Sequence, residues 1–296
     1  MRIAVTGRIG QVVSCLQERG KAAGHEVIAL GRPELDLADP ASVRRAIVAA
    51  RPDVVVSAAA YTAVDKAESE ADMAHAINAV GAGAIADAAR ELQVPLIHLS
   101  TDYVFDGSLD RPYVEEDPTG PTGIYGASKL AGEDAVLRSY PDNSAVLRVA
   151  WVYSPYGGNF VKTMLRLAAD RDEISVVADQ VGNPTSALDI ADGVLKVATN
   201  LVASSDSALR GIFHMTATGE ASWAGFAEAI FAASAERGGP CANVRHIGTA
   251  DYPTPAKRPA NSRLACAKIL EAHGVMLPQW QESLEEVVEH LLVRAA

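Results

Sequence analysis

Tyr125 and Lys129, four positions apart, form the pair in this sequence that is best suited to move a proton. If the segment around them is helical, both side chains lie on one face, one turn from each other. The ammonium then favours the phenolate, which draws the phenol pKa of about 10 toward a working range. A tyrosine tuned in this way can give a proton to a carbonyl oxygen or take one from an alcohol. An isolated pair with this spacing is more often an exposed surface pair, so other segments must decide between the two.

A glycine-containing turn near the N-terminus is the first of these segments. The apolar run 2–6 ends at Gly7, and Gly7-Arg8-Ile9-Gly10-Gln11-Val12-Val13 leads into a helix predicted to reach about Ala23. Strand, glycine turn and helix can hold a pyrophosphate, because glycine lets the backbone approach the phosphates at the helix N-terminus. Val13 replaces the usual third glycine, which predicts a helix displaced slightly outward rather than a lost site. Alone, the turn is a weak signal, since many α/β proteins contain one without a nucleotide.

The end of the second predicted strand bears on the choice of nicotinamide cofactor. Folds that prefer NAD place an Asp or Glu there to hold the ribose 2′-hydroxyl, whereas an Arg can face a 2′-phosphate. Here the strand 26–30 ends at Gly31-Arg32, with no carboxylate at its tip. This predicts NADPH, with NADH also accepted. A solvated arginine in a loop is the alternative, and it carries about equal weight.

Strands and helices alternate regularly over the first half of the chain. The predicted strands are 2–6, 26–30, 53–57, 94–100 and 144–149; helices are predicted at 40–50, begun by Asp39 and Pro40, and at 72–92. Such alternation implies a parallel sheet covered on both faces. Residues 1–150 are therefore predicted to form a Rossmann-like, doubly wound α/β domain that binds NAD(P). Ligands of such sheets lie beyond the carboxyl ends of the strands, where Gly7, residues 58–61 and Ser100-Thr101 fall.

The alternation becomes less regular after Val149. Helices are predicted at 159–169, 189–200, 222–236 and 282–295, and strands at 174–178 and 211–216. No low-complexity linker marks a boundary. Residues 151–296 are predicted to form a smaller C-terminal α/β lobe that shares the cleft and binds the substrate, with an approximate boundary because the chain crosses between the lobes.

Composition excludes several classes of partner. The net charge of −11 argues against nucleic acid, whose phosphates require basic patches. No apolar run is long enough to span a bilayer, and no secretory leader opens the sequence. The three cysteines, Cys15, Cys241 and Cys266, lack metal-ligand spacing and are read as free thiols of a reducing compartment. We expect a cytoplasmic protein with no membrane or nucleic-acid partner.

The assembled segments resemble the extended short-chain dehydrogenase/reductases and, within them, the family of dTDP-4-dehydrorhamnose reductases. The resemblance covers most of the chain. Its two most specific runs are Ser100-Thr101-Asp102-Tyr103-Val104-Phe105-Asp106-Gly107 and Tyr125-Gly126-x-Ser128-Lys129-Leu130-x-Gly132-Glu133. Other matching runs are Gly7-x-x-Gly10-Gln11-Val12, Asp36-Leu37, residues 58–68, Trp151-Val152-Tyr153, Asp179-Gln180-x-Gly182-x-Pro184-Thr185 and Arg258-Pro259-x-Asn261-Ser262.

The resemblance implies NAD(P)H-dependent reduction of a 4-keto-6-deoxy sugar nucleotide, in this family dTDP-4-dehydro-L-rhamnose to dTDP-L-rhamnose. It implies that Tyr125 is the proton donor, that the Thr101 hydroxyl orients the sugar carbonyl, and that Lys129 binds the nicotinamide ribose and lowers the tyrosine pKa. With the turn and Arg32 included, the candidate cofactor contacts are Gly7, Gly10, Gln11, Val12, Arg32, Asp36, Leu37, Ala60, Tyr61, Thr62, Tyr125 and Lys129. The implied substrate contacts are Val64, Thr101, Asp102, Tyr103 and Trp151, together with Asn159 and Arg258, for which a structural role carries equal weight.

Two other functions share these features. Sugar-nucleotide epimerases and dehydratases use the same fold and hydroxyl pair, but dehydratases usually add an acidic pair beside the catalytic hydroxyl. Here Thr101 is followed by a single Asp102 and then Tyr103, which favours a simple reductase. The regulatory subunit of methionine adenosyltransferase also resembles this family and acts by binding its partner. The intact set of Thr101, Tyr125 and Lys129 argues against such a purely scaffolding role.

The sequence departs from the family pattern at Val13, Ser57, Val149-Ala150 and Cys15. Some members of the family are dimers bridged by a metal ion through acidic side chains, one of them early in the first helix, where this chain has Cys15. A neutral thiol is a poor ligand for a hard cation such as Mg²⁺. We therefore predict no metal site, and a monomer or a homodimer without a metal bridge.

Overall fold

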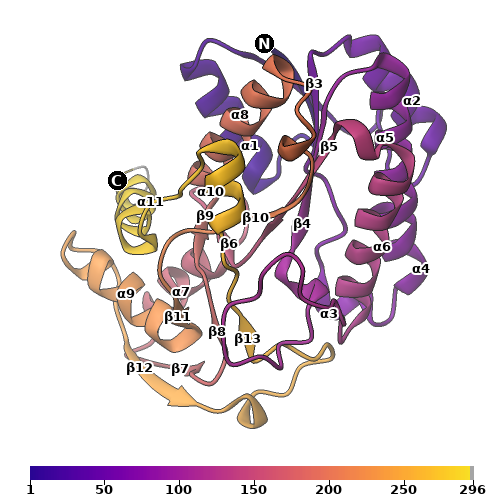
Figure 1. Cartoon of the computed structure of the whole chain (residues 1–296). Coiled ribbons are helices and arrows are strands. Elements are labelled where there is room, and N and C mark those ends of the chain that lie inside the picture. The colour runs from indigo at the N-terminus through magenta and orange to yellow at the C-terminus, as the bar shows by residue number, and fades with distance from the viewer. Residues whose placement is uncertain (294–296) are drawn as a thin grey trace.

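The computed structural model describes residues 1–293 and is built around a six-stranded parallel sheet (Figure 1). The fold is α/β and Rossmann-like, as predicted. In spatial order its strands are β10 (Gly211–His214), β5 (Ser144–Val149), β4 (Leu96–Thr101), β3 (Val54–Ser57), β1 (Arg2–Thr6) and β2 (Glu26–Leu30). Each predicted strand is present with ends shifted by at most two residues; the largest shifts are at β4, which begins two residues later than expected, and at β10, which ends two residues earlier.

Helices cover both faces of this sheet (Figure 1). One face packs against α1 (Gln11–Ala22) and α8 (Ala187–Ala203), and the other against α2 (Pro40–Ala50), α5 (Gly81–Leu92) and α6 (Ile124–Ser139). Alternate residues of a strand point to opposite faces of the sheet: Val54 and Val56 pack in the hydrophobic core on the α1 and α8 side, and Val55 packs in the core on the α2, α5 and α6 side. A sheet that is buried on both faces explains why its strands read as nearly continuous apolar runs.

The stretch predicted as one helix over 72–92 contains a local change of pitch. It comprises α4 (Ala71–His75), a π-helical turn (Ala76–Val80) and α5, which follow without a break. The turn carries Asn78, which is 2% exposed. The Asn78 Nδ2 donates to the Ser128 hydroxyl of α6 at 2.9 Å and to the Tyr61 carbonyl at 3.1 Å. The wider turn thus places a polar side chain between the loop after β3 and the helix of the Tyr/Lys pair, in keeping with the frequent use of π-bulges at functional sites.

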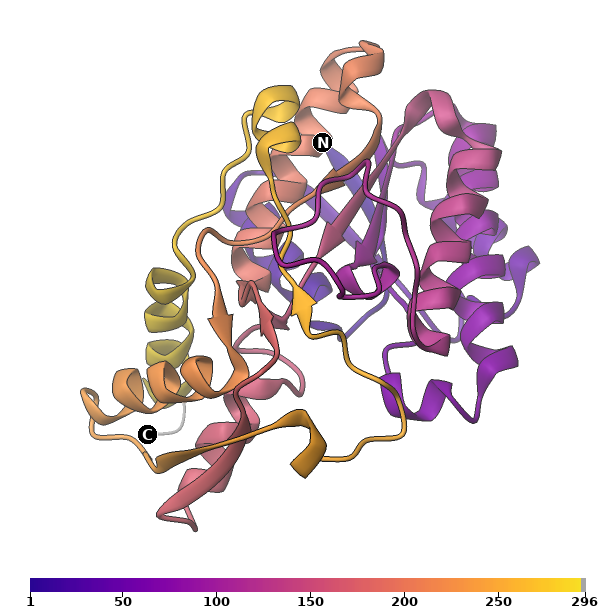
Figure 2. The ribbon, with the colours of Figure 1, turned by 60° about the horizontal axis from the view of Figure 1, so that its bottom comes forward.

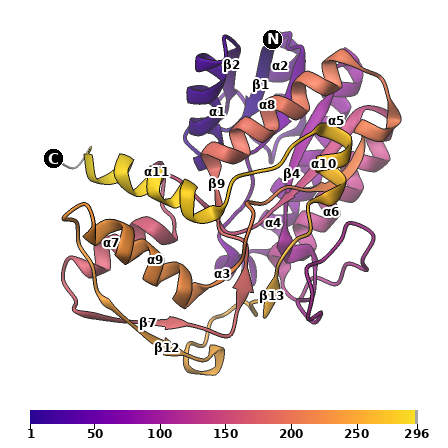
Figure 3. The same cartoon turned by 60° about the vertical axis from the view of Figure 1, so that its left-hand side comes forward.

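The C-terminal part of the chain forms a smaller lobe beside the sheet (Figures 2 and 3). Its helices are α7 (Phe160–Ala168), α9 (Trp223–Ala235) and α11 (Trp280–Val293), and α9 packs against both of the others. Its strands are short and pair as β7 (Glu173–Val177) with β12 (Asn243–Ile247), β8 (Val181–Gly182) with β11 (Ala221–Ser222) and β13 (Asn261–Ser262), and β6 (Val152–Tyr153) with β9 (Thr185–Ser186). The predicted helix over 282–295 begins earlier, at Trp280, and residues 294–296 lie outside the described part of the chain.

The chain does not separate cleanly into two halves. After the first β-strands of the lobe it returns to the main sheet, where α8 packs on α1 and β10 pairs with β5. The remaining elements are short: α3 (Val64–Ala67), α10 (Ala267–His273), and 3₁₀ turns at Asp102–Val104, Pro141–Asn143, Ser207–Leu209 and Thr249–Asp251. Among the described residues, no helix is long and apolar enough to cross a membrane.

Candidate active site

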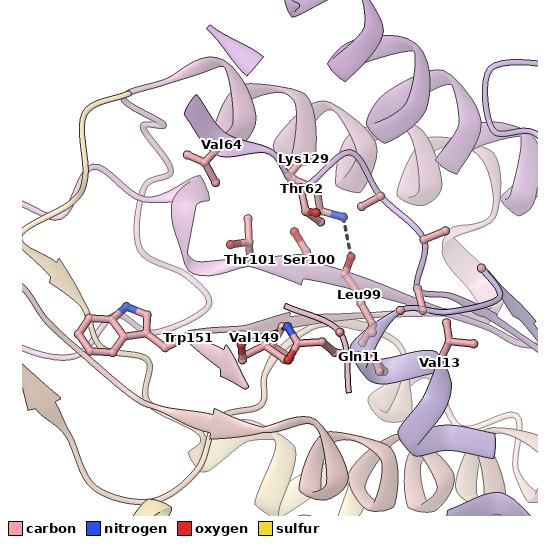
Figure 4. Close-up of a pocket in the computed structure, with 18 of the residues that line it drawn as sticks. Gln11, Val13, Thr62, Val64, Leu99, Ser100, Thr101, Lys129, Val149 and Trp151 are labelled. Atoms are coloured by element: carbon pink, nitrogen blue, oxygen red, sulfur yellow. Dashed lines mark hydrogen bonds between the residues drawn. The ribbon is translucent and has the colours of Figure 1, made fainter. Parts of the chain in front are cut away.

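A cavity of about 710 Å³ lies between the carboxyl ends of the sheet strands and the C-terminal lobe (Figure 4). Most of the residues singled out from the sequence line it. These are Gly7, Gly10, Gln11, Val12, Ala60, Thr62, Val64, Thr101, Asp102, Tyr103, Tyr125, Lys129 and Trp151. The structure therefore brings together residues that are spread over the first half of the sequence.

One end of the cavity is the N-terminus of α1. Gly7 has a φ of +106°, a conformation that L side chains rarely adopt, and a Cβ there would lie 3.1 Å from a Val13 methyl. Gly10 caps the helix without a side-chain hydrogen bond, and the first turn contains no acidic residue. The first N–H groups of the helix are thus open to an anion at the positive end of the helix dipole. This donor set fits the pyrophosphate of a dinucleotide.

The middle of the cavity is lined by the small residues that follow β3. The Thr6 hydroxyl accepts hydrogen bonds from the backbone N–H groups of Ala58 at 3.0 Å and Ala59 at 3.1 Å, which fixes this segment at the end of the sheet. Ala60 and Thr62 line the cavity. Tyr61 does not, because its hydroxyl donates to Glu70 at 2.6 Å. A contact between a cofactor and the Tyr61 side chain remains a prediction.

The two hydroxyl groups proposed for catalysis come from different elements. Thr101 ends β4, and Tyr125 stands in the first turn of α6. Gly126 makes their approach possible, because a Cβ at this position would lie 2.1 Å from the Tyr103 carbonyl oxygen. The Tyr103 and Tyr125 rings meet edge to face, with 5.5 Å between their centroids. The Thr101 hydroxyl reaches both Tyr125 and Asp102, to whose Oδ1 it donates at 2.9 Å.

Burial dominates the titration of the tyrosine and the lysine. It raises the pKa of Tyr125 to about 12, with a further rise from Asp102, while the hydrogen bond with Thr101 opposes it. Burial lowers the pKa of Lys129 to about 8, against an opposing effect of Glu133. The Lys129 ammonium donates to the Leu99 carbonyl at 2.7 Å (Figure 4). The expected lowering of the tyrosine pKa by Lys129 is thus absent from this structure, because desolvation outweighs the charge and the ammonium is turned toward the strand.

Asp102 lies beside the hydroxyl pair and is 3% exposed. Burial raises its pKa to about 6, although hydrogen bonds from Ser262 and Thr101 lower it. A carboxyl group with this pKa can change its protonation near neutral pH. It can therefore either accept the hydrogen of the Thr101 hydroxyl or release that hydroxyl to a ligand.

An aromatic wall closes the side of the cavity that faces the C-terminal lobe. Trp151 stacks on Trp223 with 3.6 Å between ring centroids, and Phe160 lies 4.6 Å from Trp223. Trp151 has a φ of +46°, a rare conformation for a bulky residue that is typically retained at functional sites. Sequence reasoning identified Trp151 but missed Trp223 and Phe160. No local signal marks these two, because they reach the cavity only through the packing of α7 and α9.

The ion pair of Arg8 with Glu34 lies near the adenosine end expected for a dinucleotide. Arg8 lines the cavity and was missed as a candidate, although it stands inside the glycine turn. Its side chain packs over Gly31, the residue before Arg32. Arg32 itself is exposed and does not line the cavity. Its role toward a 2′-phosphate remains a prediction.

Four other candidates stand outside the cavity wall. Leu37 is 7% exposed and belongs to the core, and the Asp36 carboxylate accepts the Ala38 N–H at 3.0 Å. Asn159 caps α7 and donates to Gln11 Oε1 at 3.1 Å, so it supports a cavity residue. Arg258 pairs with Asp65 at 2.8 Å. For Asn159 and Arg258 the structure thus shows supporting contacts, and direct contact with a ligand remains a prediction.

Cys15, the residue in place of a possible metal ligand, is fully buried in the core. Burial, with Glu18 next in effect, raises the pKa of its thiol to about 12. Within residues 1–293, no group of three or more His, Cys, Asp or Glu side chains is arranged to hold a metal ion.

Comparison with known proteins places this site in a family. The family model for the RmlD substrate binding domain matches residues 1–293. A dTDP-4-dehydrorhamnose reductase of Sinorhizobium fredii is 53% identical over 293 residues, which cover 99% of this chain and 98% of the relative. The crystal structure of a dTDP-4-dehydrorhamnose reductase from Clostridium acetobutylicum has a TM-score of 0.91 at 38% identity, covering 99% of this chain and 100% of that one. That of the Bacillus anthracis enzyme in complex with NADP has a TM-score of 0.89 at 36% identity, covering 97% and 98%. This chain belongs to the dTDP-4-dehydrorhamnose reductase family.

Proposed function

We propose that this protein catalyses the NADPH-dependent reduction of the 4-keto group of dTDP-4-dehydro-L-rhamnose to give dTDP-L-rhamnose. The observation that carries the proposal is the convergence of Thr101, Tyr125 and Lys129 at the end of β4, in a cavity whose far end is the open N-terminus of α1. Relatives at up to 53% identity carry the corresponding name. NADH is expected as a poorer alternative.

The cofactor residues divide by the part of the dinucleotide that each would hold. The N–H groups after Gly10 would receive the pyrophosphate, Ala60 and Thr62 would lie along its middle, and Lys129 would bind the nicotinamide ribose. Lys129 has three donors and uses one on the Leu99 carbonyl, so donors remain for a ribose hydroxyl. A bound dihydronicotinamide supplies the hydride that reduces the ketone.

The residues of this chain supply the proton that the carbonyl oxygen takes up during the reduction. A ketone that gains a hydride leaves negative charge on its oxygen, and two positioned hydroxyl groups stabilise this charge. Tyr125, with its pKa raised to about 12, is a neutral phenol at neutral pH and so carries the proton that the oxygen needs. Thr101 turns its hydrogen from Asp102 to the carbonyl oxygen when the sugar is bound.

The substrate would occupy the cavity between Asp102, Tyr103 and the aromatic wall. Val64 and Trp151 line the same space, and Trp223 completes it. The two-lobe division belongs to this proposal: residues 1–150 bind the cofactor and most of 151–296 surrounds the sugar nucleotide, apart from α8 and β10, which rejoin the sheet. We further propose a cytoplasmic enzyme that acts as a monomer or a homodimer.

Replacement of Tyr125 by Phe tests the proposal. It removes the transferable proton and keeps the ring that packs against Tyr103, so turnover should fall by about 10²–10⁴ while NADPH affinity stays near that of the wild type. Steady-state oxidation of NADPH with the 4-keto sugar nucleotide measures the first effect, and fluorescence titration the second. A Tyr125→Phe variant with near wild-type turnover would refute the assignment. An epimerase would interconvert sugar isomers without net consumption of NADPH, and a purely scaffolding protein would do neither.

A further inference from the structure

Helix α6 carries a third ionisable residue on the face of its Tyr/Lys pair. Tyr125, Lys129 and Glu133 follow at intervals of four, so they form one row along the helix. Lys129 is 3% exposed and Glu133 1%. Charged side chains are rarely buried to this extent unless each has a partner.

Two residues of the sheet hold the Glu133 carboxylate. Its Oε1 accepts a hydrogen bond from the Ser100 hydroxyl at 2.5 Å and from Arg148 Nε at 2.9 Å, and its Oε2 accepts from Arg148 Nη2 at 2.7 Å. Ser100 of β4 and Arg148 of β5 are direct neighbours in the strand register. Ser100 also lines the cavity. The carboxylate is therefore fixed directly beneath the floor of the site.

Stability alone is a poor reason for this arrangement. Taking two charges out of water costs about as much as their attraction returns, and an apolar pair of the same volume often serves equally well. The Arg148 Nη1 has no hydrogen-bond partner among the described residues, and its guanidinium lies 5.0 Å from the centroid of the Phe105 ring. A pair that leaves a buried donor unsatisfied calls for a reason beyond packing.

The electrostatic surroundings of Lys129 supply such a reason. Tyr125 and Glu133 stand one turn from it on its own helix, and His98 on β4 interacts with its charge. His98 is fully buried, and its pKa is held well below 6.5, first by burial and then by Lys129, so it is neutral and adds no positive charge beside the lysine. Tyr125 is neutral, and Glu133 is the anion that raises the Lys129 pKa against burial.

The hydrogen bonds from Ser100 and Arg148 to Glu133 also determine where the Lys129 ammonium points. Both oxygens of Glu133 are occupied by Ser100 and Arg148, so within residues 1–293 the carboxylate makes its ion pair with Arg148 and not with Lys129. Lys129, which lines the cavity, instead donates to the Leu99 carbonyl. A carboxylate without these partners would be drawn into a direct pair with the lysine.

We propose that Glu133, clamped by Arg148 and Ser100, is the positioning residue that keeps Lys129 charged yet available to the cofactor at neutral pH. The inference rests on the proposed function, in that it takes Lys129 to bind the nicotinamide ribose. Glu133 acts through Lys129 and touches neither substrate nor cofactor.

The test is the pH dependence of NADPH binding. Since Glu133→Gln alone leaves a buried guanidinium unpaired, the informative variant is Glu133→Gln/Arg148→Met, which removes both charges. Fluorescence titration between pH 6 and 10 should show the wild type losing affinity as pH rises through about 8. If the loss of the carboxylate lowers the Lys129 pKa by about one unit, the double variant should bind about fivefold more weakly at pH 8 and almost normally at pH 6. The alkaline limb of kcat/KM should move in the same direction.

Two controls separate this role from a structural one. Glu133→Asp keeps the charge and should keep the wild-type pH profile. Glu91→Gln/Arg44→Met removes an exposed ion pair of the same type and should leave the profile unchanged. A double variant at Glu133 and Arg148 that loses thermal stability but keeps the wild-type pH profile would overturn the inference. A wild type that does not bind NADPH would instead refute the proposed function, and NADPH binding that is independent of pH above 8 would refute the role of Lys129 and the inference with it.

Discussion

Replacement of Lys129 by Met should stabilise the protein in the absence of cofactor while abolishing its function. A lysine pKa that falls from 10.5 in the unfolded chain to about 8 in the folded one corresponds to a penalty of about 3 kcal/mol for the charged form. Methionine avoids this penalty but loses the hydrogen bond to the Leu99 carbonyl, which contributes about 1 kcal/mol. The net gain at pH 7 is about 2 kcal/mol, or about 5 °C in Tm for a chain of this size.

The stability gained by Lys129→Met should decrease as pH rises. Because the folded-state pKa of Lys129 is lowered, its penalty is complete below about pH 8 and disappears above the unfolded value of 10.5. The advantage of Lys129→Met should therefore be largest at pH 6 to 7 and should shrink steadily as pH rises from 8 toward 10.5. The same variant should lose both turnover and NADPH affinity, because the side chain has two roles in the proposed site.

Chemical denaturation of both proteins without cofactor, at intervals of one pH unit from 6 to 10, measures the difference in unfolding free energy. Lys257→Met is the matched control, since Lys257 is exposed and should give no comparable gain. A Lys129→Met variant that is less stable than the wild type at pH 7 would refute the reasoning. So would a difference that stays constant from pH 7 to 10.

Two further predictions concern cofactor and metal. The wild type should prefer NADPH over NADH about tenfold in kcat/KM, an effect on the order of 1 kcal/mol from a partly exposed guanidinium, and Arg32→Ala should bring the ratio toward one. An unchanged ratio in Arg32→Ala, or a wild type that favours NADH, would make Arg32 a bystander. Activity and oligomeric state should both survive EDTA, because the buried, neutral Cys15 thiol is a poor ligand for Mg²⁺. Loss of either property in EDTA, with recovery on adding Mg²⁺, would contradict this.

Local sequence signals predicted the sheet well. Asp39 and Pro40 begin α2 as expected, with the Asp39 carboxylate accepting the Ala41 N–H at 3.0 Å. Strands β2 and β5 have the predicted bounds, because both are apolar runs between polar turns. The π-helical turn at Ala76–Val80 was not predicted, since a helical pattern in sequence contains no information on a single widened turn.

The site was predictable to the extent that its residues lie at strand ends or share a helix face. Thr101, Tyr125 and Lys129 meet these conditions and line the cavity together. Trp223 does not, because its place beside Trp151 depends on the packing of a distant helix. The pKa of Tyr125 could not be predicted from the sequence either. The spacing suggests an effect of the lysine charge on Tyr125 but contains no information on the burial that outweighs this effect.

The return of the chain to the sheet at β10 has a consequence for synthesis on the ribosome. β5 is the edge of the sheet until Gly211–His214 emerges and pairs with it, so a nascent chain ending near residue 150 exposes a strand edge that carries Arg148. Unpaired edges of this kind promote association between chains. The first half of the chain therefore depends on sequence from the second half to complete its sheet, and we expect release of the first 150 residues as a separate fragment to yield an aggregation-prone intermediate.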